Sequence, residues 1–265
     1  GNHRAYAETL EELIVNQDFS PAAAIHEIEN HPEKYGQFGV RICRQTLYSY
    51  VEKGIFLQLT TKHLPFRGSR QKKKTQHIRR LKSTAKGDNI EKRPERINKR
   101  EEFGHWEMDL VVSCRGGKKC LLALTERTAP QEIIMLIPDK TKESVVQALD
   151  RLERRYGRMF PAIFKTITVD NGGEFSDCEG LERSIFKSRG HRTKMYYCHP
   201  YCSSERGSNE KQNQMIRRKF PKGTNFDKVS QKEVKAVEQW LNNYPRKSLG
   251  WKSASEVFQQ LIEAI

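Results

Sequence analysis

Apolar residues in the first 60 positions recur at helical spacing in three short stretches. Ser20 followed by Pro21 is a strong helix start, because serine caps the free N–H groups and proline suits the first turn. Gly54 is placed to end the last stretch. The pattern predicts helices at residues 6–17, 21–29 and 43–53.

Two short helices followed by a polar third helix are typical of a helix-turn-helix. Leu47, Tyr50 and Val51 are predicted to face the core of this unit. The exposed start of the third helix would then be a recognition surface for DNA. Its candidate DNA-binding residues are Arg44, Gln45, Thr46 and Tyr48. A plain three-helix packing module with a polar face explains the same pattern equally well.

From Gly104 the pattern changes to apolar strand-like runs separated by short polar turns. Strands are predicted at 106–112, 120–125, 132–137, 162–169 and 193–198. Helices are predicted at 141–156, 181–187, 204–219, 231–242 and 253–263. A ribonuclease-H-like α/β domain has its elements in this order: three strands, helix, strand, helix, strand, helix. We therefore expect a mixed five-stranded sheet with flanking helices.

These elements divide the chain into four expected parts. We expect a small all-α helix-turn-helix domain at 1–60, a basic linker at 61–102, a catalytic domain at 103–228 and C-terminal helices at 229–265. Length alone favours one or two folded units.

The net charge of +15 is concentrated in the expected linker. Residues 62–100 hold 15 Lys and Arg against three Asp and Glu. Such a block indicates a polyanionic partner, with nucleic acid before an anionic membrane surface; a solvated linker without a ligand is the alternative. Candidate DNA contacts in it are Lys72, Lys73, Lys74, Arg79 and Arg80.

Cysteine usage and hydropathy exclude other classes of protein. Six cysteines show no compact disulfide framework, so reduced thiols are expected. Cys198 and Cys202, with His199 between them, form only a weak candidate for a zinc site. No apolar run is long enough to cross a membrane, and the start does not read as a secretory signal.

Three acidic residues stand where strands and a helix would bring them together. Asp109 lies in an apolar predicted strand, where a carboxylate is costly to bury without a cation or a donor. Asp170 ends a strand and precedes Asn171 and two glycines, which let the backbone turn sharply. Glu210 lies on a predicted helix, with Asn213 one turn later. In the expected sheet the two aspartates are neighbours, and the helix lays the glutamate across them.

Clustered carboxylates need positive charge, because each raises the pKa of the others. Oxygen ligands with open positions suit Mg²⁺ or Mn²⁺, and two such ions about 4 Å apart can serve phosphodiester chemistry. Each residue alone has a simpler interpretation: the turn after Asp170 is then an ordinary loop, and Glu210 is a solvated position on a helix. Glu107 shares a strand face with Asp109 and is either an accessory ligand or a structural or DNA-facing acid.

Three segments strongly resemble the insertion-sequence-thirty family of bacterial transposases, which are relatives of retroviral integrases. They are 104–110 (GHWEMDL), 169–175 (VDNGGEF) and 205–213 (ERGSNEKQN). Segments 216–224 (IRRKFPKGT) and 242–247 (NNYPRK) look like that family too, as do Ser20-Pro21 and Thr46-Leu47-Tyr48. The resemblance covers nearly the whole chain. In this chain Met108, Lys211 and Gln214 depart from the usual family residues, and the interval from Asp170 to Glu210 is longer than usual.

The resemblance implies a DDE transposase with a retroviral-integrase-like core, whose catalytic and metal-binding residues are Asp109, Asp170 and Glu210 with two Mg²⁺ or Mn²⁺ ions. It implies strand cleavage at terminal inverted repeats and attack of the freed 3′-hydroxyl on target DNA, without a covalent protein–DNA intermediate. Expected partners are double-stranded DNA and further copies of the chain, as a homodimer or higher oligomer, with no membrane. The expected location is the cytoplasm, at the bacterial nucleoid. Family members often carry another helix-turn-helix in front, so we expect a trimmed N-terminus.

Basic residues after Glu210 fit a role in holding phosphates. Predicted DNA contacts here are Asn213, Arg217, Arg218 and Lys222. The alternative is a solvated helix end, where the dipole favours cations.

Two other functions stay open on the sequence. One is a domesticated, sequence-specific DNA-binding regulator without catalysis, although such a protein has no use for three convergent carboxylates. The other is a ribonuclease-H-like nuclease that only hydrolyses.

Overall fold

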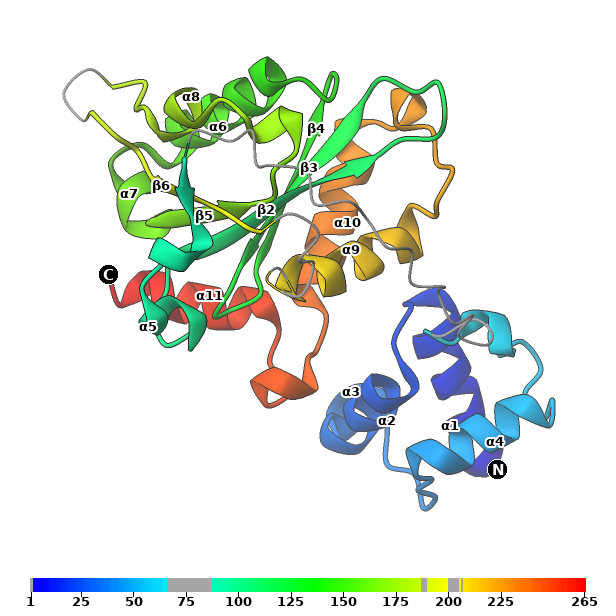
Figure 1. Cartoon of the computed structure of the whole chain (residues 1–265). Helices are drawn as coiled ribbons and strands as arrows, with labels where there is room; N and C mark the ends of the chain where they lie inside the picture. Colours follow the sequence, from blue (N-terminus) through cyan, green and yellow to red (C-terminus); the bar gives the residue numbers. More distant parts are fainter. Residues whose placement is uncertain (1, 66–86, 187–189, 200–204, 206) are drawn as a thin grey trace. The chain divides into compact units, whose positions relative to one another are not determined.

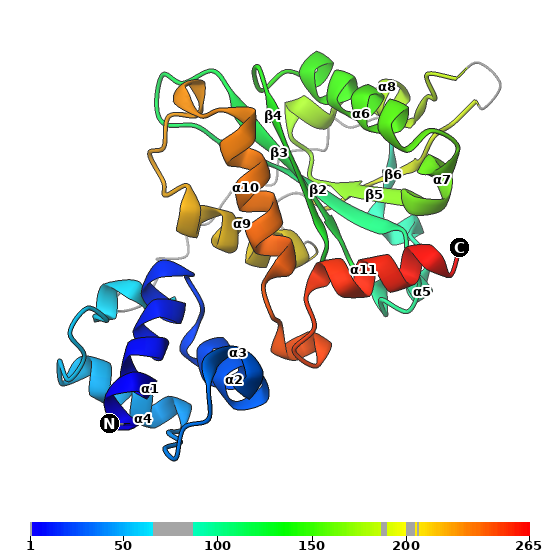
Figure 2. The same ribbon diagram turned by 180° about the vertical axis from the view of Figure 1, so that it is seen from behind.

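The computed structural model describes residues 2–65, 87–186, 190–199, 205 and 207–265 (Figures 1 and 2). The chain divides into two compact units. Unit 1 comprises Gly1–His77 and Pro245–Trp251, and unit 2 comprises Ile78–Tyr244 and Lys252–Ile265. The predicted linker contacts Lys72, Lys73, Lys74, Arg79 and Arg80 lie outside the described residues.

Unit 1 is helical and encloses its own apolar core. Its elements are α1 (Asn2–Glu11), which continues into a π-helical turn (Glu12–Asn16), α2 (Pro21–Asn30), α3 (Pro32–Tyr35) and α4 (Arg44–Glu52). Helix α2 starts at the predicted cap, where Ser20 Oγ accepts the N–H of Ala23 at 3.2 Å. The core includes Leu10, Leu13, Ala24, Ile28, Leu47 and Val51.

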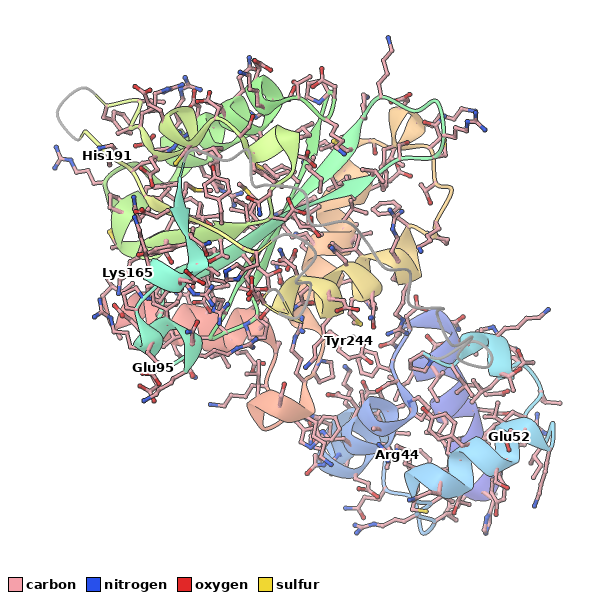
Figure 3. All side chains as sticks on the ribbon, in the orientation of Figure 1. Arg44, Glu52, Glu95, Lys165, His191 and Tyr244 are labelled. Carbon is pink, nitrogen blue, oxygen red and sulfur yellow. The ribbon has the colours of Figure 1, made fainter. Side chains whose placement is uncertain are left out.

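Helix α4 buries two of the three residues predicted to face the core. Leu47 and Val51 are buried, whereas Tyr50 is 36% exposed and the prediction for it was wrong. At 100° per residue, Tyr50 lies on the edge of the buried stripe, so its large ring stays at the surface. Figure 3 labels Arg44 and Glu52, the first and last residues of this helix.

Unit 2 is a mixed α/β unit around a six-stranded sheet of order β1-β6-β5-β2-β3-β4. The strands are β1 (Asp88–Asn89), β2 (His105–Val112), β3 (Cys120–Glu126), β4 (Glu132–Ile137), β5 (Thr166–Val169) and β6 (Lys194–Tyr197). Strands β2, β3 and β4 form an antiparallel meander, and β2, β5, β6 and β1 pair in parallel. Five strands were predicted, and β1 is the additional one.

Strand β1 comes from the segment that was expected to be linker. It pairs in parallel with β6, and Lys194 Nζ lies 2.8 Å from Asp88 Oδ2. The following helix α5 (Glu95–Asn98) is preceded by buried Arg93, whose Nη1 donates to Thr168 Oγ1 at 3.0 Å. The compact part of unit 2 therefore includes residues 88–98, which were expected in the linker.

One face of the sheet packs on the main apolar core. Helices α6 (Lys142–Tyr156), α7 (Phe160–Ile163), α8 (Cys178–Glu182) and α11 (Ala254–Glu263) contribute to it. Helix α6 starts at Thr141, whose side chain accepts the N–H of Ser144. Its buried stripe of Val145, Leu149 and Leu152 has the helical spacing seen in the sequence.

The opposite face is covered by α9 (Gly207–Lys219) and α10 (Gln231–Asn243), which lie next to each other in both views (Figures 1 and 2). Helix α10 also covers β4, the strand at the edge of the sheet. Glu238 Oε2 accepts the N–H of Ile134 at 2.8 Å, and Asn242 bonds both the N–H and the carbonyl of Glu132. These side chains satisfy edge groups that would otherwise be open to pairing. Helix α10 thus belongs to unit 2.

Several bounds differ from the prediction: α1 begins at Asn2 instead of residue 6, and two elements of unit 2 differ as well. Residues 162 and 163 were assigned to a strand but end helix α7, because Pro161 starts a helical turn that buries Phe160 and Ile163. Helix α8 spans Cys178–Glu182 instead of the predicted 181–187, and Asp177 caps its start by accepting the N–H of Gly180 at 3.0 Å.

Candidate active site

Asp109 and Asp170 lie level with each other on one face of the sheet. Strands β2 and β5 are parallel, with Glu107 opposite Thr168. Continuing this register by two residues brings Asp109 beside Asp170, and adjacent strands are about 4.8 Å apart. Because side chains alternate along a strand, both aspartates belong to the face that carries Glu107. Both are half-buried.

Helix α9 crosses this face and is fixed at its start by Glu107. The fully buried carboxylate accepts the N–H groups of Ser208 and Asn209 through Oε2, at 3.1 and 3.0 Å. Its other oxygen accepts a hydrogen bond from Arg127 Nη1 at 2.6 Å. Burial lowers the pKa of the Arg127 guanidinium, and Glu107 opposes that shift. The anion satisfies N–H groups that a helix start leaves free, and the helix dipole favours it.

Asn213 makes the next contact between α9 and β2. Its Nδ2 donates to Asp109 Oδ2 at 2.8 Å. One turn later, Arg217 Nη2 donates to the carbonyl of Val112 at 2.9 Å. Contacts at 107, 109 and 112 of the strand therefore set the position of the helix along β2.

Glu210 lies on the flank of α9 that is turned away from β3. Gln212 Nε2 donates to the carbonyl of Pro130, in the turn between β3 and β4, and so marks the other flank. Glu210 is one turn before Asn213 and shares its side of the helix. Since β5 adjoins β2 on the side away from β3, this flank is the one nearest Asp170.

The three predicted metal ligands do not meet around one point. In the described part of the chain, no group of three or more His, Cys, Asp and Glu side chains is placed to hold a metal ion. Asp109 and Asp170 are aligned, whereas the side chain of Glu210 is exposed. Asn213 Oδ1 is buried without a hydrogen-bond partner, so an unused acceptor lies beside Asp109.

The turn after β5 orients Asp170 through its backbone. The N–H of Gly172 donates to Asp170 Oδ1 at 2.9 Å. A Cβ on Gly172 would lie 2.7 Å from the carboxyl group of Glu174 and 2.9 Å from Asp170 Oδ1, which explains the glycine here. Asn171 Nδ2 donates to the carbonyl of Cys198 and ties the turn to the end of β6.

Two of the basic residues predicted to contact DNA after Glu210 have partners within the protein. Arg217 bonds the carbonyl of Val112, and burial lowers the pKa of its guanidinium. The Arg218 guanidinium lies over the rings of Trp240 and Tyr244, at 5.4 and 5.9 Å. Lys222 is exposed. A DNA role for these residues and for Asn213 stays a prediction.

The predicted recognition residues lie on the first two turns of α4. Arg44 and Gln45 are exposed, and Thr46 and Tyr48 are half-buried. Tyr48 also packs against the apolar core of unit 1. The surface open to a DNA duplex is thus greatest at the start of the helix.

His199 is hydrogen-bonded by two carboxylates. Its Nδ1 lies 2.8 Å from Glu205 Oε1 and its Nε2 lies 3.1 Å from Glu91 Oε1. Both hydrogen bonds raise the pKa of the imidazole. Cys198 is buried, and Cys202 lies outside the described residues.

Curated proteins similar to this chain are transposases of insertion sequences. The chain is 34% identical over 216 residues to the probable transposase for insertion-like sequence element IS1161 of Streptococcus salivarius, covering 81% of this chain and 58% of that protein. It is 34% identical over 173 residues to the transposase of element IS4351 of Bacteroides fragilis, covering 65% and 50%. It is 33% identical over 174 residues to the transposase InsI of element IS30C of Escherichia coli K12, covering 66% and 43%. The chain belongs to the insertion-sequence-thirty family of transposases.

The chain spans about half the length of the curated relatives it matches. No family model matches it. Among the described residues of this family member, no helix is long and apolar enough to span a membrane.

The anchoring role of Glu107 was missed by sequence reasoning. Glu107 was considered as an accessory metal ligand, but its two oxygens bind the start of α9 and Arg127. The signal available was a second acid on the same strand face as Asp109. Its partners are 20 and about 100 residues away, so the local pattern could not name them.

Proposed function

We propose that unit 2 is the DDE catalytic domain of a DNA transposase, with a ribonuclease-H-like fold. It would cleave element ends at terminal inverted repeats and join the freed 3′-ends to target DNA. Asp109, Asp170 and Glu210 are the proposed catalytic residues. The observation that carries the proposal is the parallel β2–β5 pairing, whose register, continued past the end of β5, leads from Asp109 to Asp170.

The donor set fits two Mg²⁺ or Mn²⁺ ions, because carboxylate oxygens are the ligands these hard cations prefer. The unpartnered Asn213 Oδ1 supplies a further buried oxygen at this place. Glu210 completes the set in our proposal by turning from solvent toward the aspartates when DNA binds. When bound, the ions supply charge that activates the attacking oxygen and stabilises the leaving one.

The residues of the chain orient these ligands. Asn213 donates to Asp109 Oδ2 and so orients this carboxylate. The N–H of Gly172 restrains one oxygen of Asp170. Glu107 fixes the start of α9 and so sets where Glu210 can reach. We therefore assign Glu107 a positioning role.

The proposed reaction has two steps at phosphorus. First, a water oxygen attacks the phosphodiester at the element end, and the element's 3′-oxygen leaves as a hydroxyl. Second, that 3′-hydroxyl attacks a target phosphodiester, and the target's own 3′-oxygen leaves. One bond forms and one breaks at phosphorus in each step, so no covalent link to the protein is needed.

Unit 1 is the proposed helix-turn-helix domain that recognises the terminal repeats. Its support is the exposed polar start of α4, with Arg44 and Gln45 at the surface. Because two element ends must be held together, we propose a homodimer or a higher oligomer, acting on DNA in the nucleoid.

A cleavage assay on DNA that carries the element's terminal repeats tests this function. Asp170→Asn and Asp109→Asn should each lower the Mg²⁺-dependent rate about 10³-fold, since a lost ligand removes several kcal/mol of charge stabilisation. DNA affinity should stay unchanged. Glu179→Gln, an exposed acid on α8, is the matched control and should cut normally. Chelation of the metal should stop wild-type cleavage.

The assay also separates the alternatives. Wild-type protein that binds the repeats but cuts with neither metal would support a regulator. Cleavage without joining of a pre-nicked end to target DNA would support a nuclease. Joined products from the pre-nicked end, lost in Asp170→Asn, support the transposase.

A further inference from the structure

Five basic residues lie on two loops of unit 2, at the end of the sheet where β2 finishes and β3 begins. The loop from β2 to β3 carries Arg115, Lys118 and Lys119, and the segment from α9 to α10 carries Lys222 and Lys228. Four of them are exposed, and Lys119 is half-buried. These five residues are called the basic rim.

Backbone and side-chain hydrogen bonds join the two loops. The N–H of Cys114 donates to the carbonyl of Thr224 at 2.9 Å, and the N–H of Phe226 donates to Ser113 Oγ at 2.9 Å. A Cβ on Gly117 would lie 2.3 Å from Ser113 Oγ, so the tight turn requires glycine. The rim is therefore a fixed arrangement of charges and not a set of independent surface lysines.

The acidic residues Asp227 and Asp139, near the rim, already accept hydrogen bonds from the protein. Asp227 accepts the backbone N–H groups of Lys118 and Lys119, which lowers its pKa. Asp139 accepts hydrogen bonds from Thr141 and Ser144 at the start of α6. The rim loops, residues 113–119 and 221–228, thus carry five cationic side chains and one carboxylate. Such a surplus favours a polyanion.

The rim follows directly from the elements that carry the candidate site. Strand β2 leads from Asp109 to Val112, a distance of about 10 Å at 3.3 Å per residue, and Arg115, the first residue of the rim, follows three residues later. Helix α9 leads from Glu210 past Arg217, which is bonded to Val112, and then to Lys222. The rim and the two aspartates therefore lie toward the same end of strand β2.

We propose that the basic rim binds backbone phosphates of duplex DNA on one side of the cleaved bond. The loop that carries Arg115, Lys118 and Lys119 leaves β2 about 10 Å beyond Asp109, which corresponds to roughly three nucleotides at 3.4 Å each. Loops 113–119 and 221–228 hold no exposed aromatic ring, the feature that single-strand binders use for stacking. Contacts made by lysine and arginine alone position the backbone and do not read the sequence. This inference rests on the proposed function of unit 2.

The test measures how binding of a 30-base-pair duplex of arbitrary sequence depends on KCl concentration. The variant Arg115→Gln/Lys118→Gln/Lys222→Gln/Lys228→Gln removes the four exposed charges. Each lost phosphate contact lowers the slope of log affinity against log salt by about 0.9, so we expect a slope smaller by roughly 2 to 4. The control Arg151→Gln/Arg154→Gln/Arg158→Gln removes exposed arginines associated with α6, on the other face of the sheet, and should change the slope by less than about 1.

An unchanged slope in the rim variant, or an equal loss in the control, overturns the proposal. Thermal unfolding checks that each variant folds; if the fourfold variant does not, Lys222→Gln/Lys228→Gln should still lower the slope by about 1 to 2. Lys118→Arg/Lys222→Arg/Lys228→Arg keeps the charges and should keep the slope. Asp170→Asn should bind like wild type, so a rim effect that persists while cleavage is absent would separate this proposal from the proposed catalysis.

Discussion

The two faces of the sheet in unit 2 are built from alternate residues of the same strands, yet they are held in different ways. On one face, Trp106 and Met108 of β2 join a continuous apolar core with α6, α7 and α11. On the other face, a smaller apolar cluster that includes Val111 packs against α9 and α10, and Glu107 and Asp109 add directed hydrogen bonds to α9. Apolar packing tolerates small shifts, whereas hydrogen bonds at about 3 Å fix a helix to a register.

This difference separates stability from function within one strand. The face that carries Trp106 and Met108 stabilises the fold by burying apolar surface, an effect that does not depend on the direction of the contacts. The polar face holds carboxylates whose cost of burial is offset by specific partners. A substitution on the apolar face should therefore change the free energy of unfolding most, and one on the polar face should change the rate of DNA cleavage most.

The largest effect on stability is expected at Trp106. Its side chain is fully buried, stacks on Phe164 with ring centroids 4.7 Å apart, and donates Nε1–H to the carbonyl of Ile163 at 2.7 Å. Trp106→Ala should lower the free energy of unfolding by about 3–5 kcal/mol, measured by urea denaturation. Val112→Ala on the same strand is the control, because Val112 is 47% exposed, and it should cost less than about 0.5 kcal/mol. A loss below about 1 kcal/mol at Trp106 would contradict the packing role.

A smaller loss of stability but a larger loss of activity is expected at Glu107. Glu107→Gln leaves the Arg127 charge buried without its anion. The free energy of unfolding should therefore fall by about 1–3 kcal/mol. Cleavage should fall about 10–100-fold, as for other residues that orient ligands. The measurement compares kcat for cleavage with KM for DNA, and only kcat should fall.

Glu126→Gln is the matched comparison for Glu107. Glu126 is also a fully buried acid, and it accepts the N–H groups of Gly104, Thr128 and Ala129, away from α9. Both variants should lose stability, but Glu126→Gln should retain cleavage at saturating DNA. Equal losses of cleavage in the two would show that Glu107 acts on stability alone.

The sequence predicts the long elements of unit 2 because their periodicity is local. Strands β2, β3 and β4 and helix α6 lie within two residues of the predicted bounds. The pairing of β2 with β5, on which the expected closeness of Asp109 and Asp170 rests, was also predicted. Helix α2 was predicted from its start at Ser20-Pro21, which is a local signal too.

What the sequence could not give depends on distant partners. Strand β1 is two residues long and exists through its pairing with β6, more than 100 residues away. The roles of Glu107 and Arg217 depend on which backbone groups α9 brings to them. The exposed position of Glu210 is likewise set by how α9 crosses β2, which no periodicity in the helix itself specifies.

The smallest effect expected is a pH dependence at His199, close to the polar face. Its bonds to Glu205 and Glu91 raise the pKa of the imidazole above its usual value of 6.5. A raised folded-state pKa gives stability that is fully present below pH 6.5 and is lost as pH rises through the folded-state pKa. His199→Gln should therefore lower the unfolding midpoint relative to wild type at pH 5.5, and the difference should shrink toward pH 9. A difference that is constant across this range would show that His199 contributes through packing, because only the protonated ring gains from the two carboxylates.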